Sequence, residues 1–173
     1  MELRKNIITA LLIAVGFILS QIIPGIIVGM KFDLMLSVMF VCLLINKEFK
    51  NVLVTAFLGG VITAMTTTFP GGQLPNLIDK FITCMMVYFI IRIMGKFRKN
   101  LLGIGMVAFI GTLISGSVFL TSASMIVGLP AKFKLLFMGI VLPTAFANVL
   151  VTILVYKAVN VAMKISKIKF INE

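Results

Sequence analysis

Four polar side chains on one face of a predicted helix give this sequence its clearest chemical signal. They are spaced at i, i+3, i+4 and i+7, which places an amide, an anion, a cation and a hydroxyl side by side: Asn76, Asp79, Lys80 and Thr83. Such a set can hold a zwitterion, with an ammonium group on Asp79. A carboxylate would then go to Lys80, to Asn76 or to backbone amides of the Gly71-Gly72 turn.

The depth of these charges favours a functional role. Only 11 uncharged residues separate Lys80 from Arg92, so Asp79 and Lys80 lie about one turn inside the end of an apolar helix. Ionisable residues at membrane depth are costly, and they usually face a bundle interior or a water-filled cavity. The alternative is an interfacial pair that anchors the helix end, with Lys80 reaching towards water.

Two polar stripes and a few aromatic residues extend the candidate site. Ser and Thr in apolar helices mostly bond their own backbone or a neighbouring helix, so the stripes Thr112–Ser122 and Thr144–Thr152 indicate packing by themselves. Asn148 is different, because a buried amide needs several partners. Further candidates for ligand contact are Gln73 and Phe69 in the polar loop, and the aromatic residues beside the stripes, Phe119 and Phe146.

The residue types exclude several classes of chemistry. The chain has no His, which removes histidine bases and imidazole metal ligands, and its two cysteines, Cys42 and Cys84, lie in apolar stretches without metal-ligand spacing. It has no Walker A sequence, and Asp79 is the one acid expected within the membrane, so ATP hydrolysis and two-aspartate proteolysis are excluded. We expect a protein that is not an enzyme and holds no metal or cofactor.

The composition places these residues in a membrane. Of 173 residues 61% are hydrophobic and 12% charged, whereas about 25% are charged in an average soluble domain. Six helices of about 20 residues would use most of the chain, so we expect one integral membrane domain over residues 1–173. Lys and Arg total 16 against five acids, but they lie between apolar runs, which indicates membrane topology and not nucleic-acid binding.

The uncharged runs and the Pro and Gly residues between them predict an all-α bundle of six transmembrane helices. Asn76 is expected to cap the fourth helix. Pro143 is expected to kink the sixth, because its ring would clash with the carbonyl of Gly139. Gly59, Gly60 and Gly111 each have a small residue four positions on, which predicts close helix packing. The approximate ranges are 5–23, 32–46 (a short span), 50–68, 76–94, 101–127 and 132–163.

The distribution of Lys and Arg predicts the orientation. If six spans alternate, one side of the membrane collects 12 basic residues and the other only Lys31, Lys80, Lys132 and Lys134. The positive-inside rule then makes the N and C termini cytoplasmic. The three outer connections carry Pro and Gly, and we expect them to be structured: Pro24-Gly25, Pro70-Gly71-Gly72 and Gly128-Leu129-Pro130.

Several of these segments together resemble a known family. They are Pro24-Gly25 with Gly29-Met30-Lys31 and Asp33, the run from Thr67 to Lys80 (TTFPGGQLPNLIDK), and Gly111-Thr112, Ser115-Gly116 and Val127-Gly128-Leu129-Pro130. The chain resembles the small bacterial tryptophan transport proteins of the TrpP family. Those proteins in turn look like the substrate-binding S components of energy-coupling factor (ECF) transporters.

The resemblance implies a fold, a ligand and partners. It implies a six-helix S-component bundle in the bacterial cytoplasmic membrane, a tryptophan ligand near the outer face, and a complex with a transmembrane coupling subunit and two cytoplasmic ATPases. S components use small residues four apart on the first helix to contact the coupling subunit, and Ala10 and Ala14 have that spacing. Ile18 stands where a third small residue would fall, which leaves this surface shorter or shifted towards Gly16.

Several functions stay open at this point. The first is a substrate-binding subunit for tryptophan that needs ATPase partners, or its variant with a vitamin as ligand. The second is a self-sufficient, ion-coupled carrier that works as a dimer. The third is a scaffold protein of the membrane that transports nothing, against which Asp79 and Lys80 at membrane depth argue.

Overall fold

The computed structural model describes residues 2–22, 31–95, 97 and 100–165, and within them the chain is all-helical, as predicted. The predicted Pro24-Gly25 connection, Gly29-Met30 and several of the counted basic residues (Lys96, Arg98, Lys99, Lys167 and Lys169) lie outside the described residues. The elements in chain order are α1 (Glu2–Ile22), α2 (Met35–Ile45), α3 (Phe49–Met65), α4 (Gln73–Met94), α5 (Leu101–Ile126), α6 (Phe133–Leu136), η2 (Phe137–Val141) and α7 (Leu142–Ile165).

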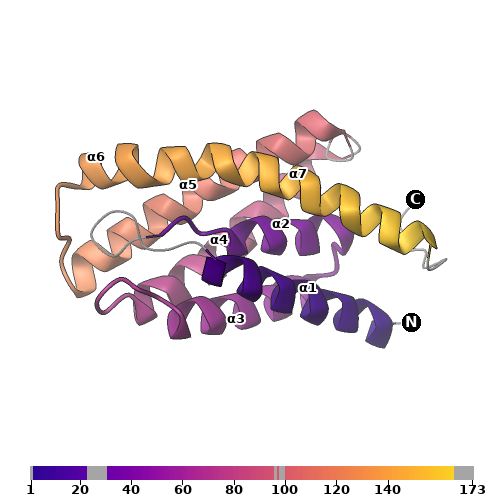
Figure 1. Ribbon diagram of the computed structural model, residues 1–173, viewed down its shortest axis with the longest axis horizontal. Helices are drawn as coiled ribbons and strands as arrows, with labels where there is room; N and C mark the ends of the chain where they lie inside the picture. Colours follow the sequence, from indigo (N-terminus) through magenta and orange to yellow (C-terminus); the bar gives the residue numbers. More distant parts are fainter. Residues whose placement is uncertain (1, 23–30, 96, 98–99, 166–173) are drawn as a thin grey trace.

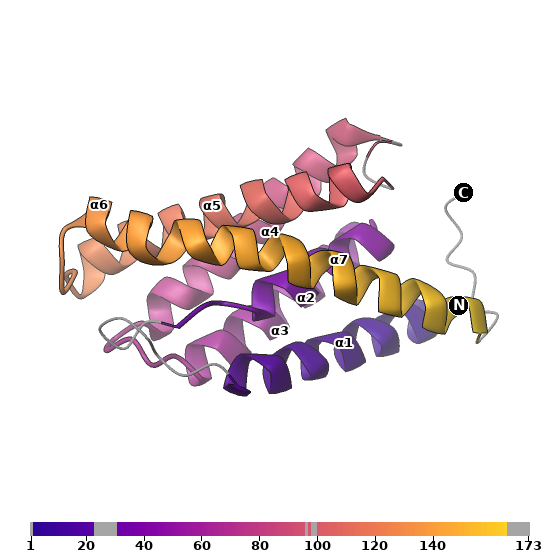
Figure 2. The same cartoon turned by 45° about the horizontal axis from the view of Figure 1, so that its top comes forward.

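The helices run alternately between the two ends of an elongated bundle (Figure 1). The start of α1 and the end of α7 lie at one end, and the ends of α1, α3 and α5 gather at the other. The sequence analysis assigned the connections between helices alternately to the two sides of the membrane, and the helices follow the same order between the two ends of the bundle. Figure 2 shows α1 at the edge of the bundle, where it packs on α2 and α3.

α2 is the central helix and differs from its prediction as a short span over 32–46. It begins at Met35 and has 11 residues, which is about 16 Å of helix, much less than the roughly 30 Å of a hydrocarbon core. Residues 35–44 are all buried, and α2 packs against α1, α3, α4, α5 and α7. A helix that is apolar on every side is stable when other helices surround it on every side.

Glycines of the neighbouring helices make room for the large side chains of α2. A Cβ atom added to Gly111 of α5 would lie 2.7 Å from Cζ of Phe40, and one added to Gly16 of α1 would lie 2.7 Å from Sδ of Met35. Gly59 of α3 faces Met39 in the same way. The close packing predicted for Gly59 and Gly111 is therefore confirmed, and α2 is the helix that requires it.

The last turn of α2 is closed by a side chain of α3. Nδ2 of Asn51 donates to the carbonyl oxygens of Cys42 (3.1 Å) and Asn46 (2.9 Å), and Thr9 of α1 donates to Oδ1 of Asn51 (2.6 Å). The carbonyl oxygen of Cys42 also accepts the backbone N–H of Asn46 (3.0 Å), so Asn51 adds a second donor to Cys42 and supplies one to the carbonyl of Asn46, just after the buried helix end.

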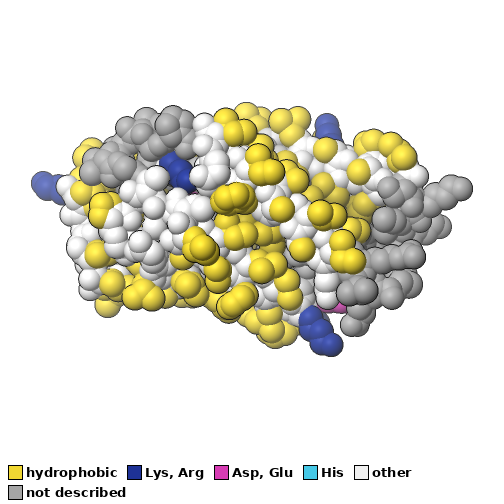
Figure 3. Space-filling view, turned by 60° about the horizontal axis from the view of Figure 1, so that its bottom comes forward, with side chains coloured by type: hydrophobic (Ala, Val, Ile, Leu, Met, Phe, Trp, Pro, Cys, Tyr) yellow, Lys and Arg dark blue, Asp and Glu magenta, His cyan; other side chains and the backbone are white. Residues whose placement is uncertain are grey.

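The surface of the bundle is apolar while charged groups are buried inside it. Large apolar side chains form an exposed stripe along α1 at residues 7, 11, 15, 18 and 22 and another along α4 at residues 78, 82, 86, 89 and 93. Figure 3 shows hydrophobic side chains along the length of one face, with few Lys or Arg among them. In the described chain two helical segments, Leu101–Ile126 and Phe133–Ile165, are long and apolar enough to cross a membrane.

α4 begins three residues earlier than predicted, so Asn76 is not its N-cap. Gly72 takes the N-cap position, and Pro75 lies in the first turn, where a missing N–H costs no intrahelical bond. Nδ2 of Asn76 donates to the carbonyl oxygen of Gly72 (2.8 Å). The earlier start places Asp79 in the second turn of α4, deeper than the sequence analysis assumed.

The irregularity predicted at Pro143 takes the form of a π-helical turn. η2 spans Phe137–Val141, immediately before the helix that carries Pro143, and it joins α6 and α7 into one continuous rod. A widened turn relieves the clash between a proline ring and the carbonyl of the preceding turn.

Candidate ligand-binding site

A cavity opens at the end of the bundle opposite the start of α1 and the end of α7. Its volume is about 780 Å³ when the part open to solvent is included. It is lined by the ends of α1 and α3, the segment 31–36, the start of α4, the middle of α5 and the η2–α7 junction. Residues from the whole length of the chain thus meet in one space.

A tight turn between α3 and α4 directs an aromatic ring into this space. The N–H of Gly72 donates to the carbonyl oxygen of Phe69 (3.0 Å), with Pro70 at the second position and Gly71 at φ +70° at the third. That combination is typical of a type II turn, in which the third residue needs a positive φ. The turn places the Phe69 ring, only 6% exposed, in the cavity wall.

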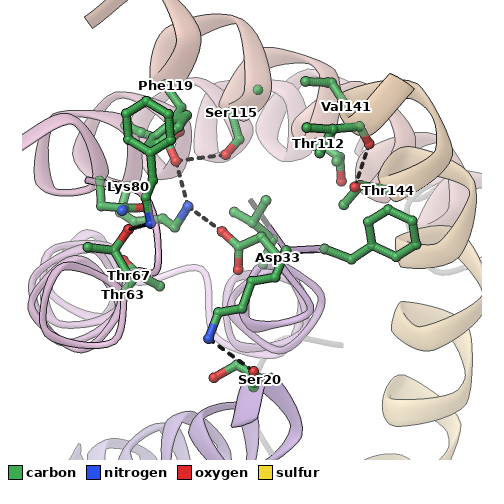
Figure 4. Close-up of a pocket in the computed structure, with 18 of the residues that line it drawn as sticks. Ser20, Asp33, Thr63, Thr67, Lys80, Thr112, Ser115, Phe119, Val141 and Thr144 are labelled. Atoms are coloured by element: carbon green, nitrogen blue, oxygen red, sulfur yellow. Dashed lines mark hydrogen bonds and ion pairs between the residues drawn. The ribbon is translucent and has the colours of Figure 1, made fainter. Parts of the chain in front are cut away.

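The charged centre of the cavity is a lysine between two carboxylates (Figure 4). Nζ of Lys80 lies 2.6 Å from Oδ2 of Asp33 and also pairs with Oδ2 of Asp79. The side chains of Lys80 and Asp79 are each 1% exposed, and that of Asp33 is 28% exposed. Asp79 and Lys80 therefore form a buried network and not an exposed anchor at the helix end.

Asp79 is held by two hydroxyl groups in addition to Lys80. Oγ1 of Thr83, one turn further along α4, donates to its Oδ1 (2.8 Å), and Oγ of Ser115 on α5 donates to its Oδ2 (2.9 Å). Three donors thus converge on one buried carboxylate, which offsets the cost of removing its charge from water.

The charges that line the cavity balance. Asp33 and Asp79 supply two negative charges, Lys80 one positive charge, and Lys31 a second, its Nζ donating to the carbonyl oxygen of Ser20 (3.2 Å). A cavity of balanced charge suits a ligand that carries both signs and no net charge.

Part of the cavity wall is aromatic and apolar. The rings of Phe69 and Phe119 meet edge to face, with centroids 5.6 Å apart and an interplanar angle of 78°. Leu120, Ile140 and Val141 also line the cavity. The cavity therefore offers both opposite charges and a surface for a flat ring.

The structure brings together five of the nine ligand-contact residues predicted from the sequence. The residues that line the cavity are Phe69, Asn76, Asp79, Lys80 and Phe119. Of the other four, Thr83 supports Asp79 from behind, and Gln73 is exposed outside the lining.

The remaining two lie away from the lining. Phe146 is 60% exposed and packs on Phe109. Asn148 is fully buried, where it accepts a hydrogen bond from Oγ of Ser37 (2.8 Å) and donates to Oγ1 of Thr112 (3.1 Å) and to the backbone oxygen of Asp33 (3.1 Å). The amide thus has the several partners expected of it, all of them in the protein.

Sequence analysis missed Asp33 as a site residue. It appeared only among the residues that carry the family resemblance, and it lies 47 positions before Lys80 in the chain. A signal was present, because the alternation of spans assigns Asp33 and Lys80 to the same side of the membrane. The sequence alone did not show that the two side chains are neighbours.

The chain is similar to known transport proteins over nearly its whole length. The profile of the family described as "Tryptophan transporter TrpP" matches residues 2–164. The chain is 42% identical to a "Probable tryptophan transport protein" of Clostridium acetobutylicum, covering 95% of this chain and 96% of that protein. Proteins of the same description from Bacillus subtilis and Clostridium perfringens are 40% and 38% identical, each over 95% of this chain and over 95% and 97% of their own length.

No solved structure matches the chain significantly. The family profile and the three relatives each cover nearly all of it. The chain belongs to the TrpP family of tryptophan transporters.

Proposed function

We propose that this chain captures tryptophan in the cavity at the outer end of a six-helix bundle in the bacterial cytoplasmic membrane. The observation that carries the proposal is the buried Lys80, held between two carboxylates in a cavity that is also lined by the edge-to-face rings of Phe69 and Phe119. A free amino acid presents an ammonium and a carboxylate close together, and tryptophan adds an indole ring that packs well on aromatic edges. The names of the relatives support tryptophan as the ligand.

Five of the predicted residues then have a specific task. Lys80 binds the carboxylate of the ligand, and Phe69 and Phe119 contact the indole. Thr83 acts through Asp79, to which it donates, and Asn148 acts through Asp33, whose backbone it bonds.

Surface and charge support the membrane orientation that we propose. The apolar stripes of α1 and α4 face outwards, which is favourable in lipid and costly in water. If the helices alternate across the membrane, the sequence assigns 12 basic residues to the side of both termini and four to the other side. With cytoplasmic termini, the cavity faces the outside, where the nutrient is captured.

We also propose that uptake is driven by a coupling subunit and two ATPases, as in ECF transporters. Ala10 and Ala14 are both exposed on α1 at the edge of the bundle, where another helix could approach closely. Gly16 is committed to packing against Met35 of α2, so this contact surface would not shift towards it.

Binding can be tested without background, because the chain contains no Trp. Purified protein is mixed with tryptophan, and the indole fluorescence of the ligand is recorded with excitation beyond the tyrosine absorption. A blue shift that saturates is expected, and unlabelled phenylalanine or a vitamin should not reverse it. Lys80→Met should abolish the shift, while the exposed Lys132→Met should keep it. Reversal by a vitamin, or no shift with a folded protein, would refute tryptophan as the ligand.

The energy source needs a separate test. Membrane vesicles that contain this chain alone should bind tryptophan and not accumulate it, and accumulation should appear when a coupling subunit and ATPases are co-expressed and ATP is supplied. Accumulation by the chain alone under an ion gradient would instead establish a self-sufficient carrier.

A further inference from the structure

The carboxylate of Asp79 is already occupied in the structure. Its two oxygens receive Thr83, Ser115 and Lys80, and its side chain is 1% exposed. A carboxylate can accept about four hydrogen bonds, so little capacity remains for an ammonium group. Asp79 is therefore poorly placed for the ammonium role that its spacing in the sequence suggested.

Asp33 has the access that Asp79 lacks. Its side chain lines the same cavity and is 28% exposed. Among the described residues only its Oδ2 is engaged, by Lys80, at 2.6 Å. An ion pair with one exposed partner can be exchanged at lower cost than one that is buried on both sides.

The backbone beneath Asp33 is fixed while its carboxylate is accessible. Nδ2 of Asn148 donates to the backbone oxygen of Asp33 (3.1 Å), and Asn148 is itself held by Ser37 and Thr112. All of these groups belong to the packed interior. The carboxylate can thus reorient by side-chain rotation without a change in the bundle.

We propose that Asp33, and not Asp79, receives the α-ammonium of the ligand, and that the ligand's carboxylate takes the place of Asp33 on Lys80. The proposal rests on the proposed function and specifies how the site selects an amino acid. In the free protein Lys80 pairs with Asp79 and Asp33. In the complex Lys80 pairs with Asp79 and the ligand's carboxylate, while the ligand's ammonium pairs with Asp33.

This exchange leaves no charge unpaired in either state. A ligand without an ammonium group would displace Asp33 from Lys80 and give it no new partner. A ligand without a carboxylate would have to share Asp33 with Lys80. The site would therefore discriminate against both kinds of analogue, because each leaves one member of the set incompletely paired.

Two fluorescent probes separate the roles of the acids. Tryptophan carries both charges, and indole-3-propionate lacks the ammonium group. Both are titrated into the purified full chain, and the ratio of their dissociation constants is compared between variants. Wild-type protein should prefer tryptophan, by about 10 to 150 fold for one charged hydrogen bond.

The proposal predicts different effects on the preference for tryptophan when Asp33 or Asp79 is substituted. Asp33→Asn should weaken tryptophan binding by most of that factor and leave indole-3-propionate binding unchanged or tighter, so the preference collapses. Asp33→Glu, which keeps the charge, should retain it. Asp79→Asn should weaken both probes by similar factors, because it disturbs Lys80 in either complex.

If Asp33→Asn keeps the wild-type preference for tryptophan over indole-3-propionate, the inference is overturned. If, in addition, Asp79→Asn loses that preference, Asp79 is the residue that binds the ammonium group. If Asp79→Asn does not fold, the comparison of Asp33→Asn with Asp33→Glu decides alone. Failure of the wild-type protein to bind tryptophan would instead refute the proposed function, and this inference with it.

Discussion

Lys80→Met should destabilise the bundle mainly through Asp79. Methionine fills similar space without a charge, so the two carboxylates lose their shared cation. Removing one partner of a buried ion pair costs about 3–5 kcal/mol. The lower end applies here, because Thr83 and Ser115 still donate to Asp79, and Asp33 is exposed enough to turn towards water.

Adding Asp79→Asn to Lys80→Met should recover part of the lost stability. Lys80→Met combined with Asp79→Asn removes both buried charges, and replacing a whole buried pair by neutral groups is often nearly neutral. We expect the double variant to regain about half or more of the loss in the free energy of unfolding. Neither variant should bind tryptophan.

Equilibrium unfolding in mixed micelles with a rising fraction of a denaturing detergent measures these energies, with helical circular dichroism as the signal. Lys132→Met, which removes an exposed lysine at the same end of the bundle, is the matched control and should change stability by less than about 0.5 kcal/mol. A double variant as unstable as Lys80→Met would show that Asp79 and Lys80 are not energetically coupled. The buried network would then be the wrong account of the site.

Three further sets of substitutions test packing, capping and the partner surface. Gly111→Ala should cost about 1–3 kcal/mol, because its Cβ meets Phe40 at 2.7 Å, whereas Gly105→Ala, whose nearest new contact is at 3.4 Å, should be neutral or stabilising in the same micelle titration. Asn51→Leu should lower stability by about 1–3 kcal/mol, because it removes the side-chain donor to the Asn46 carbonyl and the acceptor of the Thr9 hydroxyl, yet keep the tryptophan dissociation constant, since it lies at the end of the bundle away from the cavity. Ala10→Phe with Ala14→Phe should spare tryptophan binding by the isolated chain and abolish ATP-driven uptake of labelled tryptophan with the partner subunits, and unchanged uptake would remove these alanines from the contact surface.

The helices could be predicted because most are apolar runs between Pro, Gly or charged residues. The differences lie at the helix starts, where local rules compete. Asn76 is a good N-cap residue, but Pro75 is compatible with a first helical turn and the helix starts at Gln73 instead. The range 32–46 was predicted as a short span, and the described helix in it covers only Met35–Ile45.

The site was predictable only where its residues share one helix. Asp79, Lys80 and Asn76 were found from i, i+3 and i+4 spacing, which needs no tertiary information. Asp33 could not be paired with Lys80 in that way, because their contact depends on how α2 and α4 pack. The direction of Phe146 was equally undetermined, since a helix with apolar residues on most sides gives little signal for the face turned inwards.

The shortness of α2 is what makes room for the cavity. α2 fills the centre of the bundle from Met35 onwards, and Leu36, in its first turn, lines the cavity. The segment just before α2 is not helical. It carries Phe32 and Asp33, which also line the cavity. A full-length span at this position would occupy the space with side chains and leave Lys80 facing a packed helix. A short central helix instead leaves a buried floor beneath a cavity that opens at the end of the bundle, and that arrangement strengthens charge pairing with a small ligand while keeping the site accessible.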